Sequence, residues 1–100
     1  MGRVGRAVLN DNPLLAFLGR RGRGAVVEAL RRNPARRLHV RELARLADVA
    51  PMVASRAVRE LAAMNAVDVS RQGRLLAVRL DPGTPAGAFL ATVAVPDPPF

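Results

Sequence analysis

The sequence predicts an α+β fold that is mostly helical, and a change of pattern along the chain carries this prediction. Between Val40 and Asn65 the apolar residues recur with the period of about 3.6 that is typical of a helix packed on one face. Beyond Asn65 the period changes to 2, as expected for strands with one buried face. The chain has 100 residues, the size of one domain with a modest core.

The stretch from Val40 to Asn65 is predicted to form two helices joined by a tight turn. Asp48 tolerates turn and left-handed backbone conformations better than most residues, so we place the end of the first helix there. Pro51 fits the first turn of the second helix, where a backbone N–H would have no partner in any case. The inner faces of the two helices are predicted to carry Val40, Leu43, Ala44, Ala47, Ala54, Val58, Leu61 and Met64.

Two strands joined by a turn are predicted directly after the second helix. Residues 67–71 alternate apolar and polar side chains, and residues 75–80 form the returning strand. Gln72 and Gly73 are predicted to form the turn, because glycine readily adopts the positive φ that tight hairpin turns require. The Asp-Pro-Gly sequence at residues 81–83 ends the second strand.

The segments before the helix pair are predicted to support it. Residues 1–11 form a flexible, basic N-terminus, and a short apolar helix follows over residues 13–18. The Arg-Arg-Gly-Arg-Gly sequence at residues 20–24 forms a basic hinge, and the next helix runs over residues 25–32. Residues 38–40 are a short extended piece that enters the helix pair.

The C-terminal segment, residues 83–100, leaves two interpretations open. Thr84 can cap a helix and Pro85 can begin it. Residues 91–95, which read Ala-Thr-Val-Ala-Val, are also acceptable as a strand. A proline-rich tail follows in either case.

The chain is strongly basic. Sixteen basic residues, all of them arginine, stand against eight acidic residues, which gives a net charge of +8. Arginine binds phosphate groups and guanine edges through paired hydrogen bonds. A GC-rich genome explains the choice of arginine over lysine, but it does not explain the excess of basic over acidic residues. That excess predicts a polyanionic partner, with nucleic acid ahead of an anionic membrane surface.

Other features of the composition exclude several classes of protein. The chain has no cysteine, which excludes thiolate chemistry and fits a reducing, cytoplasmic location. No apolar run reaches the roughly 18 residues of a membrane span, so the chain is not expected to cross a membrane. With nucleic acid ranked first, no membrane partner is predicted. His39 is the only histidine and lacks a second ligand, so neither a metal nor another cofactor is expected. Ser55 and Ser70 have no usable base in the pattern, so the chain is not predicted to be an enzyme.

The helix pair carries a family resemblance. Residues 40–47 follow the order apolar-x-x-Leu-Ala-x-x-Ala, and residues 51–61 read Pro-x-x-Ala-Ser-Arg-x-Val-Arg-Glu-Leu. This order resembles the helix-turn-helix of bacterial winged-helix regulators of the ArsR and MarR type, over residues 22–81. The resemblance implies a winged helix-turn-helix over residues 12–82 with a two-stranded wing, flanked by N- and C-terminal segments. It also implies sequence-selective binding of double-stranded DNA by a homodimeric transcriptional regulator.

The resemblance places the second helix of the pair in the major groove of DNA. Arg56 is the strongest candidate for a base contact, because a guanidinium group binds guanine at two points. The residues expected to reach bases are Met52, Val53, Ser55, Arg56 and Arg59. The residues expected at the DNA backbone or in the wing are Arg36, Arg37, Arg41, Arg45, Arg71, Gln72 and Arg74, with Arg79 also considered. A solvated arginine surface is the alternative interpretation of these positions.

The start of the second helix departs from the family pattern. Ala50, Met52 and Val53 stand where the family usually carries Ser or Thr. Alanine cannot accept a capping hydrogen bond, a loss of about 1 kcal/mol, and the other two side chains offer only apolar contacts. This keeps a second hypothesis open, in which the chain is a protein-interaction or regulatory module for a partner enzyme and binds DNA only non-specifically.

Two apolar segments outside the helix pair are expected to form or support the dimer interface. Each is too apolar to lie in water alone, so it packs on its own core or on a second copy. A two-fold dimer would present its two second helices about one DNA turn apart. The residues assigned to this interface are Leu14, Leu15, Phe17, Leu18, Phe89, Leu90 and Val93.

Overall fold

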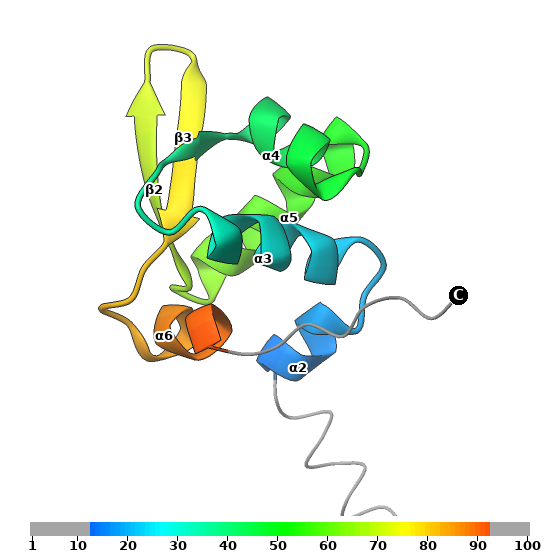
Figure 1. Cartoon of the computed structure of the whole chain (residues 1–100), viewed down its shortest axis with the longest axis vertical. Coiled ribbons are helices and arrows are strands. Elements are labelled where there is room, and N and C mark those ends of the chain that lie inside the picture. The colour runs from blue at the N-terminus through cyan, green and yellow to red at the C-terminus, as the bar shows by residue number, and fades with distance from the viewer. Residues whose placement is uncertain (1–12, 93–100) are drawn as a thin grey trace, which may run out of the picture.

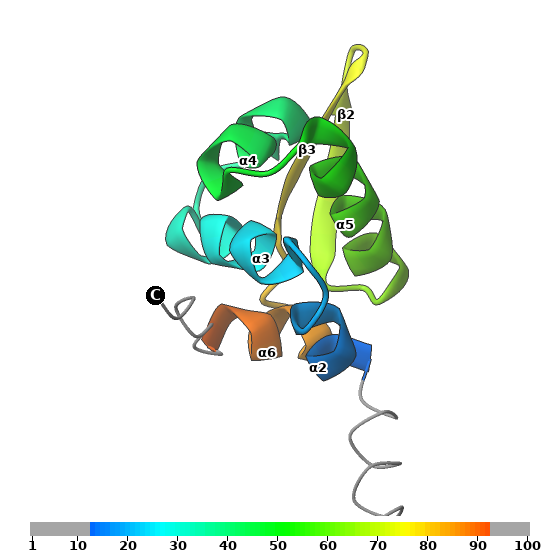
Figure 2. The ribbon, with the colours of Figure 1, turned by 90° about the vertical axis from the view of Figure 1, so that its right-hand side faces the viewer.

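A computed structural model describes residues 13–92, which form a small, mostly helical α+β domain (Figure 1). The elements follow the order α2 (Pro13–Leu18), α3 (Arg23–Arg32), β1 (Leu38–His39), α4 (Val40–Ala47), α5 (Pro51–Ala63), β2 (Val67–Gln72), β3 (Leu75–Leu80) and α6 (Pro85–Thr92). Helices α3, α4 and α5 pack on one another and on the sheet. Figure 2 shows α2 and α6 at one end of the domain and the β2–β3 turn projecting at the other.

The sheet has three antiparallel strands in the order β1-β3-β2: the predicted hairpin, and the short extended piece that the sequence predicted ahead of α4. Leu38 pairs with Val78, and His39 pairs with Ala77. The short strand is therefore confirmed, whereas its pairing with β3 is a long-range contact that the sequence did not indicate. Leu38 is fully buried, so this strand also supplies a core side chain.

Each helix of the predicted pair is followed by a residue in the left-handed conformation. Asp48 and Asn65 have φ values of 56° and 58°, the only non-glycine residues in the left-handed region within residues 13–92. The amides of Val49 and Ala66 then reach back to Ala44 and Leu61 with N···O distances of 3.0 and 2.9 Å. These bonds satisfy carbonyl groups that a helix end leaves open. The end of the first helix at Asp48 is therefore confirmed, with this residue in the left-handed conformation.

Helix α3 begins at Arg23, two residues earlier than the sequence predicted. Gly22 precedes it with a φ of 79°, a conformation that glycine adopts without a steric penalty. Gly24 was expected to belong to the hinge, but it lies inside the first turn of the helix. The Arg23 side chain is only 8% exposed, so it belongs to the interior and not to a solvated hinge.

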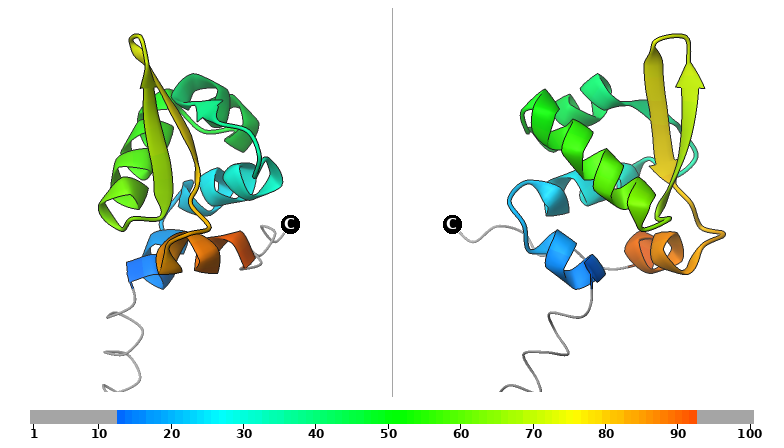
Figure 3. Two further views of the ribbon diagram at one scale, coloured as in Figure 1. Left: turned by 90° about the vertical axis from the view of Figure 1, so that its left-hand side faces the viewer. Right: turned by 180° about the vertical axis from the view of Figure 1, so that it is seen from behind.

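The C-terminal segment forms a helix from Pro85 to Thr92. Within the described residues, the helical alternative is therefore confirmed. The hydroxyl oxygen of Thr84 accepts a hydrogen bond from the amide of Gly87 at 3.1 Å and so caps α6. The same hydroxyl lies 2.5 Å from the carbonyl oxygen of Asn65, to which it donates. Helix α6 is thereby attached to the end of α5 (Figure 3).

The core contains side chains that the sequence assigned to a dimer interface. Phe17 and Leu90 are 3% and 0% exposed, so both lie inside their own subunit and cannot form a contact surface. Leu14 and Leu18 are partly buried against the same core. Of the remaining residues assigned to the interface, Phe89 is 38% exposed, Val93 lies outside the described residues, and so does the Leu15 side chain. The fully buried large side chains are Leu30, Leu38, Leu43, Leu61, Leu90, Val26, Val27 and Val78.

None of the helices within residues 13–92 is long and apolar enough to cross a bilayer.

We predict that Gly87→Ala strongly destabilises the domain. An added methyl group would overlap the carbonyl group of Asp81 and lie 2.8 Å from the carbonyl oxygen of Ala66. Because these neighbours are backbone atoms that cannot move independently, we expect a loss of about 3 kcal/mol in the free energy of unfolding, measured by urea denaturation. The control is Gly83→Ala, where the methyl group meets only the Asp81 carboxylate at 3.2 Å. Equal stability of the two variants would contradict the close approach of α6.

Candidate nucleic-acid interface

An open groove of about 480 Å³ lies where the start of α4, helix α5 and the β2–β3 hairpin meet. The lining residues come from all three elements: His39, Val40, Arg41, Ser55, Arg74, Leu75 and Leu76. The lining includes two guanidinium groups and a hydroxyl but no carboxylate. This combination is suited to an anionic group such as a phosphate. The sequence did not predict this groove as a unit, although it singled out Arg41, Ser55 and Arg74 separately.

Four of the five predicted base-reading residues share one side of α5. Met52, Arg56 and Arg59 are exposed and Ser55 is half-buried, a spacing of three and four residues that places them along one face. Val53 differs from the prediction. It is half-buried and faces the segment between α2 and α3, where a methyl group added to Gly22 would lie only 2.9 Å from it.

The hairpin turn is displaced by one residue from its predicted position. Gln72 pairs with Leu75, so the two-residue turn consists of Gly73 and Arg74 instead of Gln72 and Gly73. Gly73 has a φ of 65°, as the first position of a type II′ turn requires. The Arg74 side chain therefore projects from the turn itself.

Gln72 and Arg79 do not lie free at the hairpin turn. The Gln72 side-chain oxygen is 3.0 Å from Nε2 of His39 and so connects the hairpin to the start of α4. Arg79 pairs with Asp68 at the opposite end of the hairpin, and its Nε lies 3.5 Å from the carboxylate. Gln72 therefore positions the hairpin, and Arg79 is remote from its turn.

The arginines divide into two groups according to whether a carboxylate neutralises them. Within residues 13–92, ion pairs involve Arg20 and Arg23 with Glu60, Arg31 and Arg32 with Glu28, Arg36 with Glu42, and Arg37 and Arg79 with Asp68. The described arginines without such a partner are Arg21, Arg41, Arg45, Arg56, Arg59, Arg71 and Arg74. Six of these seven belong to the predicted DNA-contacting set and lie on α4, α5 and the hairpin.

Two residues of the predicted backbone-contacting set are held elsewhere. Arg37 donates to Asp68 at 2.6 Å, and this hydrogen bond holds the pKa of Asp68 below its ordinary value. Arg36 is paired with Glu42 of α4. Their pairing leaves these two side chains less available for a phosphate than the seven arginines without a carboxylate.

The sequence did not reveal that Glu60 joins the α2–α3 segment to α5. Arg23 Nε lies 2.8 Å from one carboxylate oxygen of Glu60, and Arg20 Nη1 lies 2.5 Å from the other. Burial raises the pKa of Glu60, but the hydrogen bonds from Arg23 and Arg20 outweigh it, so the pKa lies below its ordinary value. Arg20 and Arg23 were assigned to a basic hinge, and no local pattern connects them to a residue 40 and 37 positions away.

Comparison with known proteins adds no assignment: no family model matches this chain, and no curated protein matches it.

We predict that replacing Glu60 destabilises the domain in a pH-dependent way. Glu60→Ala leaves the buried Arg23 guanidinium without its carboxylate, so we expect a loss of about 3 kcal/mol at pH 7, measured by urea denaturation. Since the pKa of Glu60 is lowered in the folded state, its contribution is complete above the ordinary value of 4.5 and is lost as the pH falls below it. The wild-type chain should therefore be more stable than Glu60→Gln at pH 7, and this difference in the free energy of unfolding should disappear in acid.

The matched control is Glu28→Ala. The partners of Glu28 are Arg31 and Arg32, whose side chains are 36% and 72% exposed. Water can solvate both guanidinium groups once the carboxylate is removed, so we expect a cost below about 1 kcal/mol. A cost for Glu60→Ala as small as that of the control would show that Arg23 does not need its carboxylate.

Proposed function

We propose that this chain is a winged helix-turn-helix domain that binds double-stranded DNA sequence-selectively, as a homodimeric transcriptional regulator in the cytoplasm. Helix α5 enters the major groove, and the β2–β3 hairpin is the wing, with Arg74 at the minor groove or backbone. The helix order, the tight turn between α4 and α5, and the hairpin that follows α5 support the proposal. They match the arrangement that the family resemblance implies.

The distribution of unpaired arginines is the observation that carries this proposal. Helices α4 and α5 contain one carboxylate each, Glu42 and Glu60, and arginines from other segments neutralise both. In the hairpin, Asp68 is likewise occupied by Arg37 and Arg79. The surface shared by α4, α5 and the hairpin turn, all within residues 13–92, therefore keeps six free guanidinium groups, against one carboxylate without an ion pair, that of Asp48 on the α4–α5 turn. Such a surface attracts a polyanion.

Each group of free arginines has a distinct role in this proposal. Arg56, on the exposed face of α5, reads a guanine edge. Arg41 from α4 and Arg74 from the hairpin turn bind phosphates at the groove that also contains the Ser55 hydroxyl. Arg45 and Arg71 contribute to the same positive surface from α4 and β2. Base reading thus depends on few side chains, whereas backbone attraction comes from several.

An interaction module for a partner enzyme is the second candidate function, with only non-specific DNA affinity. The start of α5 supports it, since Ala50 provides no capping hydrogen bond and Met52 is 65% exposed. A salt titration with random duplex DNA separates the two functions. The DNA-binding proposal fails if the chain does not bind duplex DNA even at low salt.

We predict different effects for two arginine variants in DNA-binding assays by fluorescence anisotropy, using a site selected from random duplexes. Arg56→Ala should weaken the selected site by about 1 to 3 kcal/mol while leaving random DNA nearly unchanged. Arg74→Ala should weaken both DNAs equally and reduce the slope of log K against log salt by about 1. Arg32→Ala is the control, because Arg32 lies on α3 and is paired with Glu28. If Arg56→Ala weakened both DNAs by the same factor, its assigned role would be wrong.

We also predict that Phe89→Glu converts a dimer into a monomer, measured by sedimentation equilibrium. With Phe17 and Leu90 in the core, Phe89 is the large apolar side chain of α6 left exposed. A charge placed in a subunit contact costs more than one placed in water. Leu46→Glu on α4 is the control, since Leu46 is 51% exposed and lies away from α6. A wild-type chain that is monomeric at high concentration would argue against the dimer itself.

A further inference from the structure

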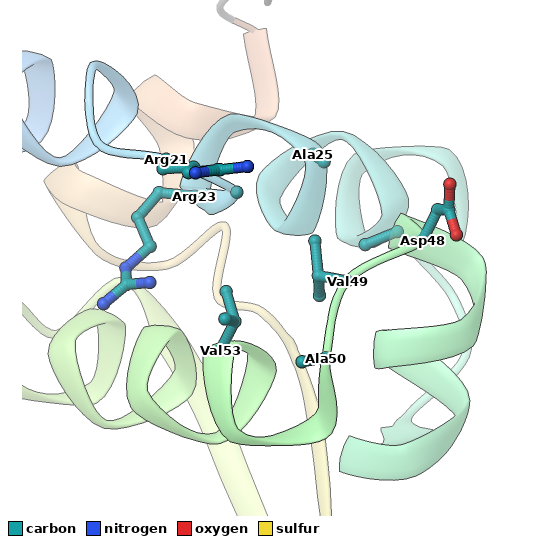
Figure 4. Close-up of a pocket in the computed structure, with 9 residues that line it drawn as sticks. Arg21, Arg23, Ala25, Asp48, Val49, Ala50 and Val53 are labelled. Carbon is teal, nitrogen blue, oxygen red and sulfur yellow. The ribbon is translucent and has the colours of Figure 1, made fainter.

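A second groove, of about 660 Å³, lies between the start of α3 and the start of α5. Its floor is apolar: Figure 4 shows Val49 and Val53 pointing into the space between the two helices, with Ala25 and Ala50 at its sides. The volume lies within the range of about 300 to 1,000 Å³ that is typical of ligand sites. Nothing in the proposed DNA contacts uses this groove, because Val53 faces away from the exposed side of α5.

The rim of the groove carries Arg21, the one free arginine among residues 13–92 that does not belong to the predicted DNA-contacting set. Arg20 and Arg23 are both bound to Glu60, at 2.5 and 2.8 Å, whereas Arg21 between them has no carboxylate partner among residues 13–92. In Figure 4, Arg21 lies along the rim while Arg23 points away toward α5. The only acidic residue of the lining is Asp48, whose carboxylate points outward from the groove. The groove thus combines an apolar floor with a positively charged edge.

Two exposed apolar side chains lie near the ends of α4 and α5 that the tight turn joins. Leu46 and Met52, which adjoin the lining residues in the chain, are 51% and 65% exposed and are the two most exposed large apolar side chains of the described part. A small molecule held in the groove would leave both uncovered. A polypeptide segment can fill the groove and cover them as well, and exposed apolar surface of this kind marks protein contacts.

We propose that this groove binds a short segment of a partner protein in which a large apolar side chain is flanked by carboxylates. The apolar side chain packs on Val49 and Val53. A flanking carboxylate pairs with Arg21, and the rest of the segment covers Met52 and Leu46. The groove itself lies on the other side of the first turn of α5 from Arg56, whereas Met52 also belongs to the predicted base-reading face, so the segment and DNA would share that one side chain.

The test is a titration of the ¹⁵N-labelled chain with the probe peptide N-acetyl-Asp-Glu-Leu-Phe-Glu-Asp-amide, followed by amide NMR shifts. We expect saturable shifts concentrated at Ala25, Val49 and Val53. There are two control peptides, one with lysines in place of the acidic residues and one with serines in place of Leu-Phe. Both should bind at least about tenfold more weakly, because the first lacks the carboxylates and the second lacks the apolar side chains.

Two variants locate the contact. Arg21→Glu reverses the free charge at the rim, and Ala25→Glu adds a carboxylate at an exposed position in the first turn of α3, where an acidic residue favours the helix. Each should weaken the probe peptide by about tenfold or more through like-charge repulsion. The matched control is Arg71→Glu, which changes the net charge equally on the hairpin and should leave binding within about twofold, since solvent screens distant charges.

Three results would overturn the proposal. The first is the absence of saturable shifts with the probe peptide. The second is equal weakening by Arg21→Glu and Arg71→Glu, which would reduce the effect to general charge attraction. The third is a set of shifts centred on another surface, such as α6. None of these results depends on whether the chain binds DNA.

Discussion

The ion pair between Arg23 and Glu60 is the contact on which the arrangement of the helices depends. It joins the first turn of α3 to the last part of α5, across 37 positions of sequence. The guanidinium group is almost entirely removed from water, so it is stable there only with its carboxylate. Because α4 packs on both α3 and α5, this contact fixes one side of a three-helix arrangement. The orientation of the exposed face of α5 follows from it.

Much of the fold could be predicted because the responsible signals are local. The bounds of α4 agree with the prediction. Asp48, which tolerates the left-handed conformation, follows this helix directly, and Pro51 begins the next one. The hairpin was recognised from its alternation, which depends on nearest neighbours. The errors arose where distant contacts decide. Gly24 lies inside α3, whose first residue, Arg23, is held by Glu60. The short strand β1 was predicted, but its pairing with β3 through Leu38 and Val78 was not.

The candidate interface could be predicted only as a collection of residues. Their positions on helices and on the hairpin follow from periodicity, so Arg41, Arg56 and Arg74 were identified correctly as outward residues. Periodicity does not show which arginines are neutralised. Arg37 and Asp68 are 31 positions apart, and their pairing depends on how β1 is placed beside β3. The groove that unites three elements was likewise beyond a local pattern.

The junction at Thr84 has a consequence for where the folded unit ends. The Thr84 hydroxyl lies 2.5 Å from the carbonyl oxygen of Asn65, and the amide of Asp81 donates to Ala66 at 3.0 Å. Leu90 is fully buried in the common core. A chain shortened to end before Thr84 would therefore lose both a cap and a core side chain, and it would expose apolar surface on α3 and β3. Helix α6 is an integral part of the folding unit rather than an appendage, so any partner that binds it acts on the whole domain.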